Sequence, residues 1–300
     1  MSILSFTNQK IDGIINTRLG YVVQTFYVKN MKILLEYFNK NRKYFKYSSL
    51  SIAAILLVVA VLFICFCFFD SNKNLAVLGV VSDIHAGNPS ERVVEARILN
   101  YPKQYKKLFS EALDKMKNEG VEVVISAGDN TNEGDIQYSK TLKDLAKSRA
   151  IKILWTKGNH DREKTKSMES FGVKIPYYYI MDRKNWRIII LDNSEMNSES
   201  SNGGFSQEQL EWLKNKLKTD KKIIISMHYP IFNEFNNDEV LVEYKEFKDI
   251  IEKSGNVVHV VSGHYHTIDL EKNISGITYH IIKSLTLDKD NPNYKIISLE

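Results

Sequence analysis

The chain has 300 residues, of which 43% are hydrophobic and 26% are charged, and these proportions are typical of a folded protein rather than a disordered one. The net charge of +5 is concentrated near the N-terminus: residues 1–49 carry eight Lys or Arg against two Asp or Glu, whereas residues 70–300 carry 33 against 34. Because the larger part of the chain is nearly neutral, its composition argues against a nucleic-acid-binding domain, and we expect no nucleic-acid partner.

The first 49 residues predict a basic segment on the cytoplasmic side of a membrane. Apolar residues recur at helical spacing over residues 11–38, which is typical of an amphipathic helix lying on the inner leaflet. An alternative is that Met31 is the true start, since the residues after it alone form a basic flank. The sequence leaves both possibilities open.

Residues 50–69 predict a transmembrane helix, because they form twenty uncharged and mostly apolar positions. At about 1.5 Å rise per residue, such a helix covers the roughly 30 Å hydrocarbon core of a bilayer. The run is longer than the apolar region of a cleaved signal peptide and ends in Phe-Cys-Phe-Phe-Asp, a poor cleavage site. Its two cysteines are the only ones in the chain, so the remainder offers no thiolate metal site.

The basic residues beside this run predict its orientation. Four of them, Lys40, Arg42, Lys43 and Lys46, stand just before the span, and only Lys73 follows closely. By the positive-inside rule, we expect a single-pass protein of the cell membrane that contacts the lipid bilayer through residues 50–69. Its N-terminus would be cytoplasmic and its main domain extracytoplasmic.

From Leu75 onward, apolar runs alternate with charged segments of helical spacing, which predicts one α/β (α+β) domain over residues 75–300. Strands are expected at 75–81, 121–126, 151–155, 187–191, 222–227 and 257–261, and two short strands after residue 268. Helices are expected near 103–118, 136–148, 206–218 and 243–253. Gly120 should end the first helix, and Ser206 should cap the third.

Five of these strands run directly into side chains that can bind metal ions. These side chains are Asp83 and His85, then Asp129, then Asn159, His160 and Asp161, then His228, and finally His264 and His266. In α/β sheets the carboxyl ends of the strands border the crevice where ligands bind, so we expect the side chains to meet in one polar pocket. The two other histidines, His259 and His280, lie within expected strands and are interpreted as structural.

The chemistry of this set predicts two divalent metal ions. Imidazole nitrogens, carboxylates and an amide oxygen, without thiolate, suit Mn, Fe or Zn. Two such ions about 3.5–4 Å apart can clamp a phosphoryl group and lower the pKa of a bound water. Ions at that separation need a bridging carboxylate, and Asp129 is the natural candidate.

The order Asp-x-His, Gly-Asp, Gly-Asn-His-Asp, His and Gly-His-x-His resembles that of the calcineurin-like metallophosphoesterases over about residues 75–270. The resemblance implies a two-sheet αββα sandwich with helices outside and the site at one rim, here preceded by the single transmembrane helix. Leu191-Asp192-Asn193 also looks like family sequence. One departure is Asn130, because the residue after the bridging aspartate is often apolar.

The resemblance also implies a role for each residue of the set. Asp83, His85 and His266 would bind the first metal. Asn159, His228 and His264 would bind the second. Asp129 would bridge the two ions. His160 would act on the substrate as an acid or electrostatic stabiliser, oriented by Asp161.

These roles predict a membrane-anchored, binuclear metal-dependent phosphoesterase (hydrolase) that cleaves phosphate mono- or diesters by attack of a metal-bridging hydroxide. The sequence permits two alternatives. A 3',5'-cyclic-nucleotide phosphodiesterase would fit if the domain were cytoplasmic, and a non-catalytic phosphoesterase-like module would fit if the domain only bound phosphate esters.

Overall fold

The computed structural model describes residues 74–87, 101–161, 166–194, 203–236 and 238–299. The chain divides into two units, residues 1–72 and 73–300, and the fold given below is that of the second. The basic segment and the transmembrane helix expected over residues 1–69 lie outside the described residues. Within the described ranges, no helix combines the length and the apolar character needed to cross a bilayer.

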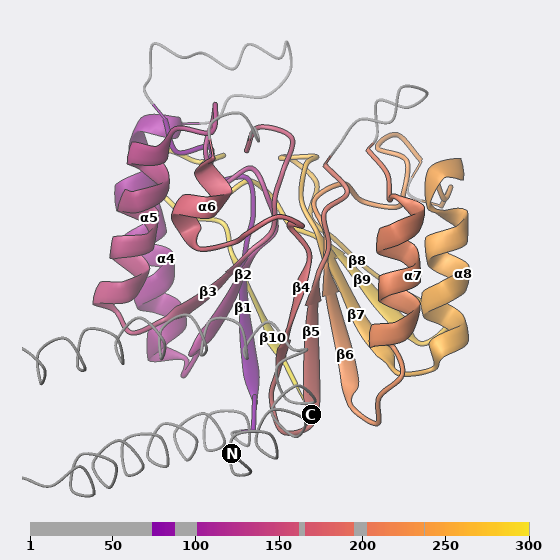
Figure 1. The fold of residues 1–300 in the computed structure, drawn as a ribbon. Coiled ribbons are helices and arrows are strands. Elements are labelled where there is room, and N and C mark those ends of the chain that lie inside the picture. Colours follow the sequence, from indigo (N-terminus) through magenta and orange to yellow (C-terminus); the bar gives the residue numbers. More distant parts are fainter. Residues whose placement is uncertain (1–73, 88–100, 162–165, 195–202, 237, 300) are drawn as a thin grey trace, which may run out of the picture. The chain divides into compact units, whose positions relative to one another are not determined.

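The first of two sheets has four strands in the order β10-β1-β2-β3 (Figure 1). Their bounds are β1 Val77–Val81, β2 Val123–Ser126, β3 Lys152–Trp155 and β10 Lys295–Ser298. Strands β1, β2 and β3 are parallel, and β10 pairs antiparallel with β1. The carboxyl ends of the three parallel strands therefore share one edge of the sheet.

The second sheet has six strands in the order β4-β5-β6-β7-β9-β8. Their bounds are β4 Tyr179–Asp182, β5 Trp186–Ile190, β6 Lys222–Ser226, β7 Val257–Ser262, β8 Leu270–Ile274 and β9 Ile277–Ile281. Strands β5, β6, β7 and β9 are parallel, whereas β4 and β8 are antiparallel strands at the two edges.

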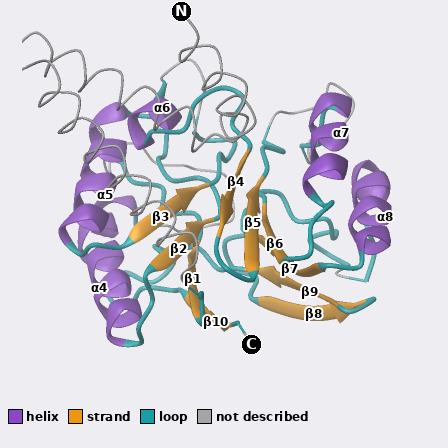
Figure 2. Ribbon diagram, turned by 60° about the horizontal axis from the view of Figure 1, so that its bottom comes forward, coloured by secondary structure: helices purple, strands orange, loops and turns teal. Residues whose placement is uncertain are grey.

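Helices cover the outer face of each sheet (Figures 1 and 2). The helices α4 (Tyr105–Asn118) and α5 (Ile136–Ser148) lie beside the first sheet, with the short α6 (Ser167–Phe171) near their ends. The helices α7 (Gln207–Lys216) and α8 (Lys245–Ser254) lie beside the second sheet. Two 3₁₀ turns, Pro102–Gln104 and Val242–Tyr244, lead into α4 and α8.

The alternation of side chains along the strands builds three apolar layers. Leu78 and Ile188 point into the layer between the sheets. Val81 points into the layer under α4 and α5, and Ile189 points into the layer under α7 and α8. All four side chains are fully buried, and each such burial contributes about 1.5–3 kcal/mol. Because both faces of each sheet are covered, the strands are apolar throughout, as in buried parallel sheets.

The fold predicted from the sequence, a two-sheet sandwich with helices on both outer faces, is confirmed for the described residues. The six expected strands and four expected helices are present within a few residues of their predicted bounds. The Ser206 hydroxyl caps α7 by accepting from the backbone NH of Gln209 at 3.2 Å. Gly120 follows α4 with φ of 80°, a backbone conformation that glycine adopts without strain.

Three short elements, α6, β4 and β8, were not predicted. The strands β4 and β8 lie at sheet edges and are only partly buried. In β8, Leu-Glu-Lys-Asn-Ile has few apolar residues, because one face of this strand meets solvent. A strand held mainly by its neighbour leaves a weak signal in the sequence.

Candidate metal centre

The predicted site residues meet at the edge formed by the carboxyl ends of the parallel strands. They follow β1, β2 and β3 in the first sheet and β6 and β7 in the second. Their side chains form two groups whose potential ligand atoms lie within 4.8 Å of one another. The first group is Asp83, His85, Asp129 and His266, and the second is Asp129, His228 and His264.

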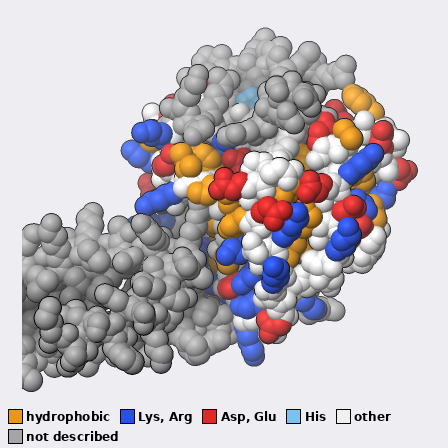
Figure 3. Space-filling model, turned by 45° about the vertical axis from the view of Figure 1, so that its right-hand side comes forward, with side chains coloured by type: hydrophobic (Ala, Val, Ile, Leu, Met, Phe, Trp, Pro, Cys, Tyr) orange, Lys and Arg blue, Asp and Glu red, His pale blue; other side chains and the backbone are white. Residues whose placement is uncertain are grey.

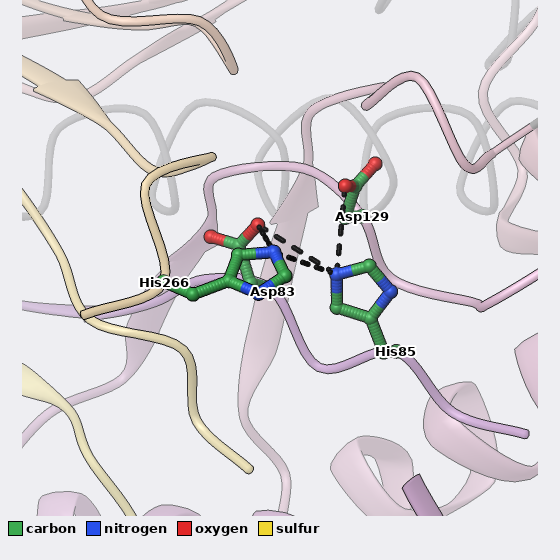
Figure 4. A group of neighbouring side chains, drawn as sticks. All are labelled: Asp83, His85, Asp129 and His266. Carbon is green, nitrogen blue, oxygen red and sulfur yellow. Dashed lines mark hydrogen bonds and ion pairs between the residues drawn. The ribbon is translucent and has the colours of Figure 1, made fainter. Parts of the chain in front are cut away.

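In the first group, the imidazoles of His85 and His266 face the Asp83 carboxylate (Figure 4). Nε2 of His266 lies 3.2 Å from Oδ1 of Asp83, and Nε2 of His85 lies 3.8 Å from the same oxygen. The two Nε2 atoms are 3.1 Å apart. Three ligand atoms therefore surround one small space, although two of the residues are 181 positions apart in the sequence.

The second group is built around His228, which is fully buried. Its Nδ1 lies 3.0 Å from the carbonyl oxygen of Ala127, which can only accept, so Nδ1 carries the proton. Its Nε2, which lies 3.0 Å from Oδ1 of Asn159, is therefore the ring nitrogen that would act as a ligand. The structure thus places Asn159, His228 and His264 beside Asp129, as predicted from the sequence.

Asp129 belongs to both groups. Its Oδ2 lies 3.5 Å from Nε2 of His85 and 3.2 Å from Nε2 of His228. Its other oxygen, Oδ1, accepts a hydrogen bond from the backbone NH of His160 at 2.8 Å. One carboxylate oxygen therefore stands between an imidazole of each group, which is the arrangement that a bridging ligand requires.

The donor set fits divalent cations. Oδ1 of Asp83 is buried and accepts no hydrogen bond from the described residues, although two imidazole nitrogens lie close to it. A buried carboxylate oxygen without a donor is costly, and a cation held between it and the imidazoles would remove that cost. Carboxylate, imidazole and amide ligands suit Mn, Fe or Zn.

Burial and neighbouring charges set the protonation of three predicted ligands, which come from both groups. Burial raises the pKa of Asp83, but the charge of His266 opposes it strongly, and the resulting pKa is about 2. Burial lowers the pKa of His85 and of His264 to about 3. At neutral pH these residues are therefore an ionised carboxylate and neutral imidazoles, which are the forms that bind metal.

The electrostatics of His228 differ. Burial lowers its pKa, but the adjacent Asp129 carboxylate outweighs burial and raises the pKa to about 9. The same contact holds the pKa of Asp129 well below its usual range, against the effect of burial. The proton on His228 is stabilised by the negative charge of the Asp129 carboxylate. A cation bound beside Asp129 would neutralise that charge instead, so metal binding would release the proton.

The backbone at the site is in an unusual conformation. Five predicted metal ligands have φ in the left-handed region: Asp83 at 50°, His85 at 46°, Asp129 at 48°, His264 at 72° and His266 at 38°. Each non-glycine residue in this region costs about 1–2 kcal/mol. Such strain concentrates at functional sites, where the surrounding structure enforces it.

Two glycines allow the strand ends to approach each other. A Cβ on Gly263 would collide with Oγ of Ser82 and Oδ2 of Asp83, and a Cβ on Gly158 would collide with the backbone and carboxylate of Asp129. Neither glycine has a positive φ. Their role is therefore to leave space for the carboxylates rather than to provide a left-handed turn.

The expected role of Asp161 needs correction. Its buried carboxylate accepts hydrogen bonds from Asn130, Thr131 and Gly158. The His160 ring is held instead by the carbonyl oxygen of Asn132, 2.9 Å from Nδ1. Burial and then the charge of Asp129 raise the pKa of Asp161 to about 6. Asp161 thus shapes the loop that carries His160, and Asn132 orients the ring.

Sequence reasoning also missed the role of Asn193, which supports His228. Its Oδ1 accepts from the backbone NH of His228 at 3.0 Å and of Tyr229 at 3.2 Å. Its Nδ2 donates to the Tyr229 carbonyl at 2.9 Å and to the Tyr244 hydroxyl at 3.0 Å. The sequence contains a signal for this role, because Leu191-Asp192-Asn193 resembles family sequence.

The two remaining histidines lie outside both groups. Nδ1 of His259 on β7 lies 3.1 Å from Nε2 of His280 on the neighbouring β9. The His259 ring stacks at 6.3 Å on Trp186, at the start of β5. These contacts are those of side chains that pack within the sheet, as expected.

Comparison with known proteins identifies the family. The family model described as calcineurin-like phosphoesterase matches residues 76–267. The chain belongs to this family. The family uses two divalent metal ions, and the two groups of potential ligands described above are consistent with such a pair.

Two relatives are named as phosphodiesterases. A probable glycerophosphodiester phosphodiesterase GpdQ of Arcobacter nitrofigilis is 26% identical over 158 residues, 49% of this chain and 57% of that protein. A probable cyclic nucleotide phosphodiesterase of Ruthia magnifica subsp. Calyptogena magnifica is 28% identical over 191 residues, 62% of this chain and 76% of that protein. The match thus spans little more than half the length of the first relative.

A solved structure shows the same fold. A dimetal phosphatase from Danio rerio is 15% identical, with a TM-score of 0.59 over 76% of this chain and 93% of that chain. At this level of identity the likeness supports the two-sheet architecture.

The space beside Asp83 generates a prediction. Gly263→Ala should weaken Mn²⁺ binding about 10- to 100-fold, because its Cβ would displace Ser82 and Asp83. Isothermal titration of the purified chain with Mn²⁺ measures this effect. The matched control is Gly204→Ala, since no atom lies within 4 Å of a Cβ there and φ is not positive. Equal affinity in the two variants would contradict the prediction.

Proposed function

We propose that this chain is a membrane-anchored enzyme that hydrolyses phosphate esters, and phosphodiesters in particular, at a two-metal centre. The observation that carries the proposal is the Asp129 carboxylate, which is shared by two groups of potential ligands. The names of both relatives support a diester substrate.

The ligand atoms divide naturally between two ions. Asp83, His85 and His266 would hold one ion, and Asn159, His228 and His264 would hold the other, with Asp129 between them. When bound, such a pair supplies positive charge to the phosphoryl oxygens and lowers the pKa of a bound water. The chain's own contribution is to fix these side chains before substrate arrives, because left-handed backbone and buried hydrogen bonds leave them little freedom.

His160 is the residue that would act on the leaving group. Its backbone NH is tied to Asp129 and its Nδ1 to the Asn132 carbonyl, so both the main chain and the ring are fixed. Because Nδ1 carries a proton toward that carbonyl, Nε2 remains to donate to the leaving oxygen when the ring is protonated. The ring lies beside the first group, with its centroid 4.8 Å from that of His85.

Membrane anchoring is the second part of the proposal. The apolar run at residues 50–69 and the basic residues before it support a single span with the catalytic domain extracytoplasmic. In that compartment, candidate substrates are phospholipid head groups, nucleotides and phosphodiesters of the cell envelope. On the face shown in Figure 3, acidic and basic side chains are interspersed, so this face has no single-sign patch of the kind that binds a polyanion.

The alternative is a cyclic-nucleotide phosphodiesterase, which the name of the Ruthia magnifica relative favours. The same ligand set could serve a cyclic phosphodiester, because the reaction is again the attack of an activated water on phosphorus. The two proposals differ in the compartment in which the domain must work.

The shared carboxylate generates the first prediction of the proposed function. The full chain in detergent should bind two Mn²⁺ ions and hydrolyse bis(4-nitrophenyl) phosphate, and Asp129→Ala should lower kcat/KM by about 100-fold or more. Chelation should abolish the activity, and added Mn²⁺ should restore it. The control is Asp114→Asn, which loses only a surface ion pair with Arg149. Retention of the parent's metal stoichiometry and activity by Asp129→Ala would refute the proposal.

The position of His160 generates the second prediction. His160→Ala should lower kcat about 100-fold or more for a diester with an alkyl leaving group. The loss should be smaller for a 4-nitrophenyl leaving group, which departs without a proton. Steady-state rates for both substrates, at saturating metal, measure the difference. An equal loss for both substrates would show that His160 does not assist the leaving group.

The proposed anchor generates the third prediction. Protease added to intact cells should cleave the catalytic domain, because it would lie outside the cytoplasmic membrane. The control is the same treatment after lysis, together with a cytoplasmic marker that must remain intact in whole cells. Protection of the domain in whole cells would reject the extracytoplasmic orientation and favour the cyclic-nucleotide alternative.

A further inference from the structure

Asn130, the residue that departs from the usual family pattern, is fully buried beside the site. Both the oxygen and the nitrogen of its side-chain amide form hydrogen bonds. Oδ1 accepts from the Ser126 hydroxyl at 2.5 Å. Nδ2 donates to the carbonyl of Thr156 at 2.8 Å and to Oδ2 of Asp161 at 2.7 Å. This single side chain therefore joins the end of β2, the end of β3 and the loop that follows β3.

Asn130 also supplies the side-chain amide that holds the Asp161 carboxylate. Oδ2 of Asp161 accepts from the backbone NH of Asn130 at 3.0 Å and of Gly158 at 3.1 Å, in addition to the amide. Oδ1 accepts from the NH and the hydroxyl of Thr131 at 3.0 and 3.1 Å. Both oxygens are thus occupied, and the carboxylate has one position available to it.

The segment held in this way carries two of the proposed functional side chains. The NH of Asp161 donates back to the carbonyl of Gly158 at 3.2 Å, which closes a turn over residues 158–161. Asn159 and His160 lie between those two ends. Within the described residues, the Asp161 carboxylate contacts the β2 loop through Asn130 and Thr131, and of these two only Asn130 also reaches the Thr156 carbonyl after β3. His160 makes its own contacts with Asp129 and Asn132 in the same loop.

We propose that Asn130 is a positioning residue whose side-chain amide sets the placement of Asn159 and His160 relative to Asp129. The proposal rests on the proposed function, since it assigns Asn159 to the second metal and His160 to the leaving group. Asn130 and Asp129 are adjacent in the chain. The hydrogen bonds of the Asn130 amide therefore fix the position of the turn relative to the Asp129 carboxylate. The first group has no member in residues 158–161 and touches them only through Asp129, whose Oδ1 accepts from the backbone NH of His160.

The chemistry of the position requires an amide. It must accept from a hydroxyl and donate to a carbonyl and a carboxylate at once, and only Asn or Gln among the side chains offers both an oxygen acceptor and an NH₂ donor. Leucine offers neither. Aspartate keeps the shape but places a second carboxylate against Asp161.

The test compares Asn130→Leu with Asn256→Leu in the full chain. Asn256 is a matched control, because its Nδ2 also donates two hydrogen bonds, here to the backbone carbonyls of Leu217 and Thr219, at the opposite end of β7. Mn²⁺ titration should show one of the two binding steps weakened about 10- to 100-fold in Asn130→Leu and both steps unchanged in Asn256→Leu.

A kinetic measurement separates positioning from a general loss of structure. In Asn130→Leu, kcat should fall more for an alkyl than for a 4-nitrophenyl leaving group, because a misplaced His160 assists the alkoxide poorly. Asn256→Leu should lower kcat for the two substrates equally or not at all. Should Asn130→Leu fail to fold, Ser126→Ala, which removes only the hydroxyl that orients the amide, should show the same pattern at smaller amplitude.

Three results would overturn the proposal. One is an unchanged Mn²⁺ titration in folded Asn130→Leu. Another is the weakening of both binding steps to the same extent. The third is an equal loss in Asn130→Leu and Asn256→Leu, which would indicate an ordinary packing defect. A parent chain that binds two Mn²⁺ ions without hydrolysing any ester would refute the proposed function, whereas the titration would still decide the role of Asn130 in metal placement.

Discussion

The contact of one carboxylate with imidazoles from two groups is the constraint on which the site depends. Asp129 comes from the first sheet, and His228 comes from the second. For one carboxylate to face both His85 and His228, the ends of β1, β2 and β6 must meet at a common edge. The sandwich produces this meeting, because an apolar layer shared by the two sheets aligns the carboxyl ends of their parallel strands.

The backbone conformation at the strand ends then directs the ligand side chains toward one another. Left-handed residues turn the chain sharply as it leaves β1, β2 and β7, so that a strand end delivers its side chain into the pocket. Two glycines keep the turns close to the carboxylates. Side-chain amides hold these turns by hydrogen bonds. Asn130 donates to the Asp161 carboxylate at the end of residues 158–161, and Asn193 accepts from the backbone NH of His228. The backbone strain is confined to these left-handed residues, whereas the interactions that offset its free energy are distributed over both sheets.

Much of this arrangement could be predicted from the sequence. Buried parallel strands are recognisable in the sequence as apolar runs. The polar residues that follow such strands lie at one edge of the sheet, so Asp83, Asp129 and His228 could be placed together. The partners of Asp161 and the role of Asn130 could not be predicted, because they depend on how two loops cross in space. The edge strand β8 was missed for another reason: Lys272 stands between Leu270 and Ile274 on its less exposed face, so the strand lacks the apolar alternation of a covered strand.

The separation of interacting residues along the chain has a consequence for synthesis. Asp83 receives a hydrogen bond from the backbone NH of His264, 181 residues later, and β1 finds its antiparallel neighbour only in β10, at the C-terminal end. A nascent polypeptide therefore exposes its first acidic ligand long before its last imidazoles exist. Contacts between residues so far apart in the sequence are slow to form, because the intervening chain must first lose conformational entropy. The complete set of potential ligands can therefore come together only after nearly the whole domain has been made.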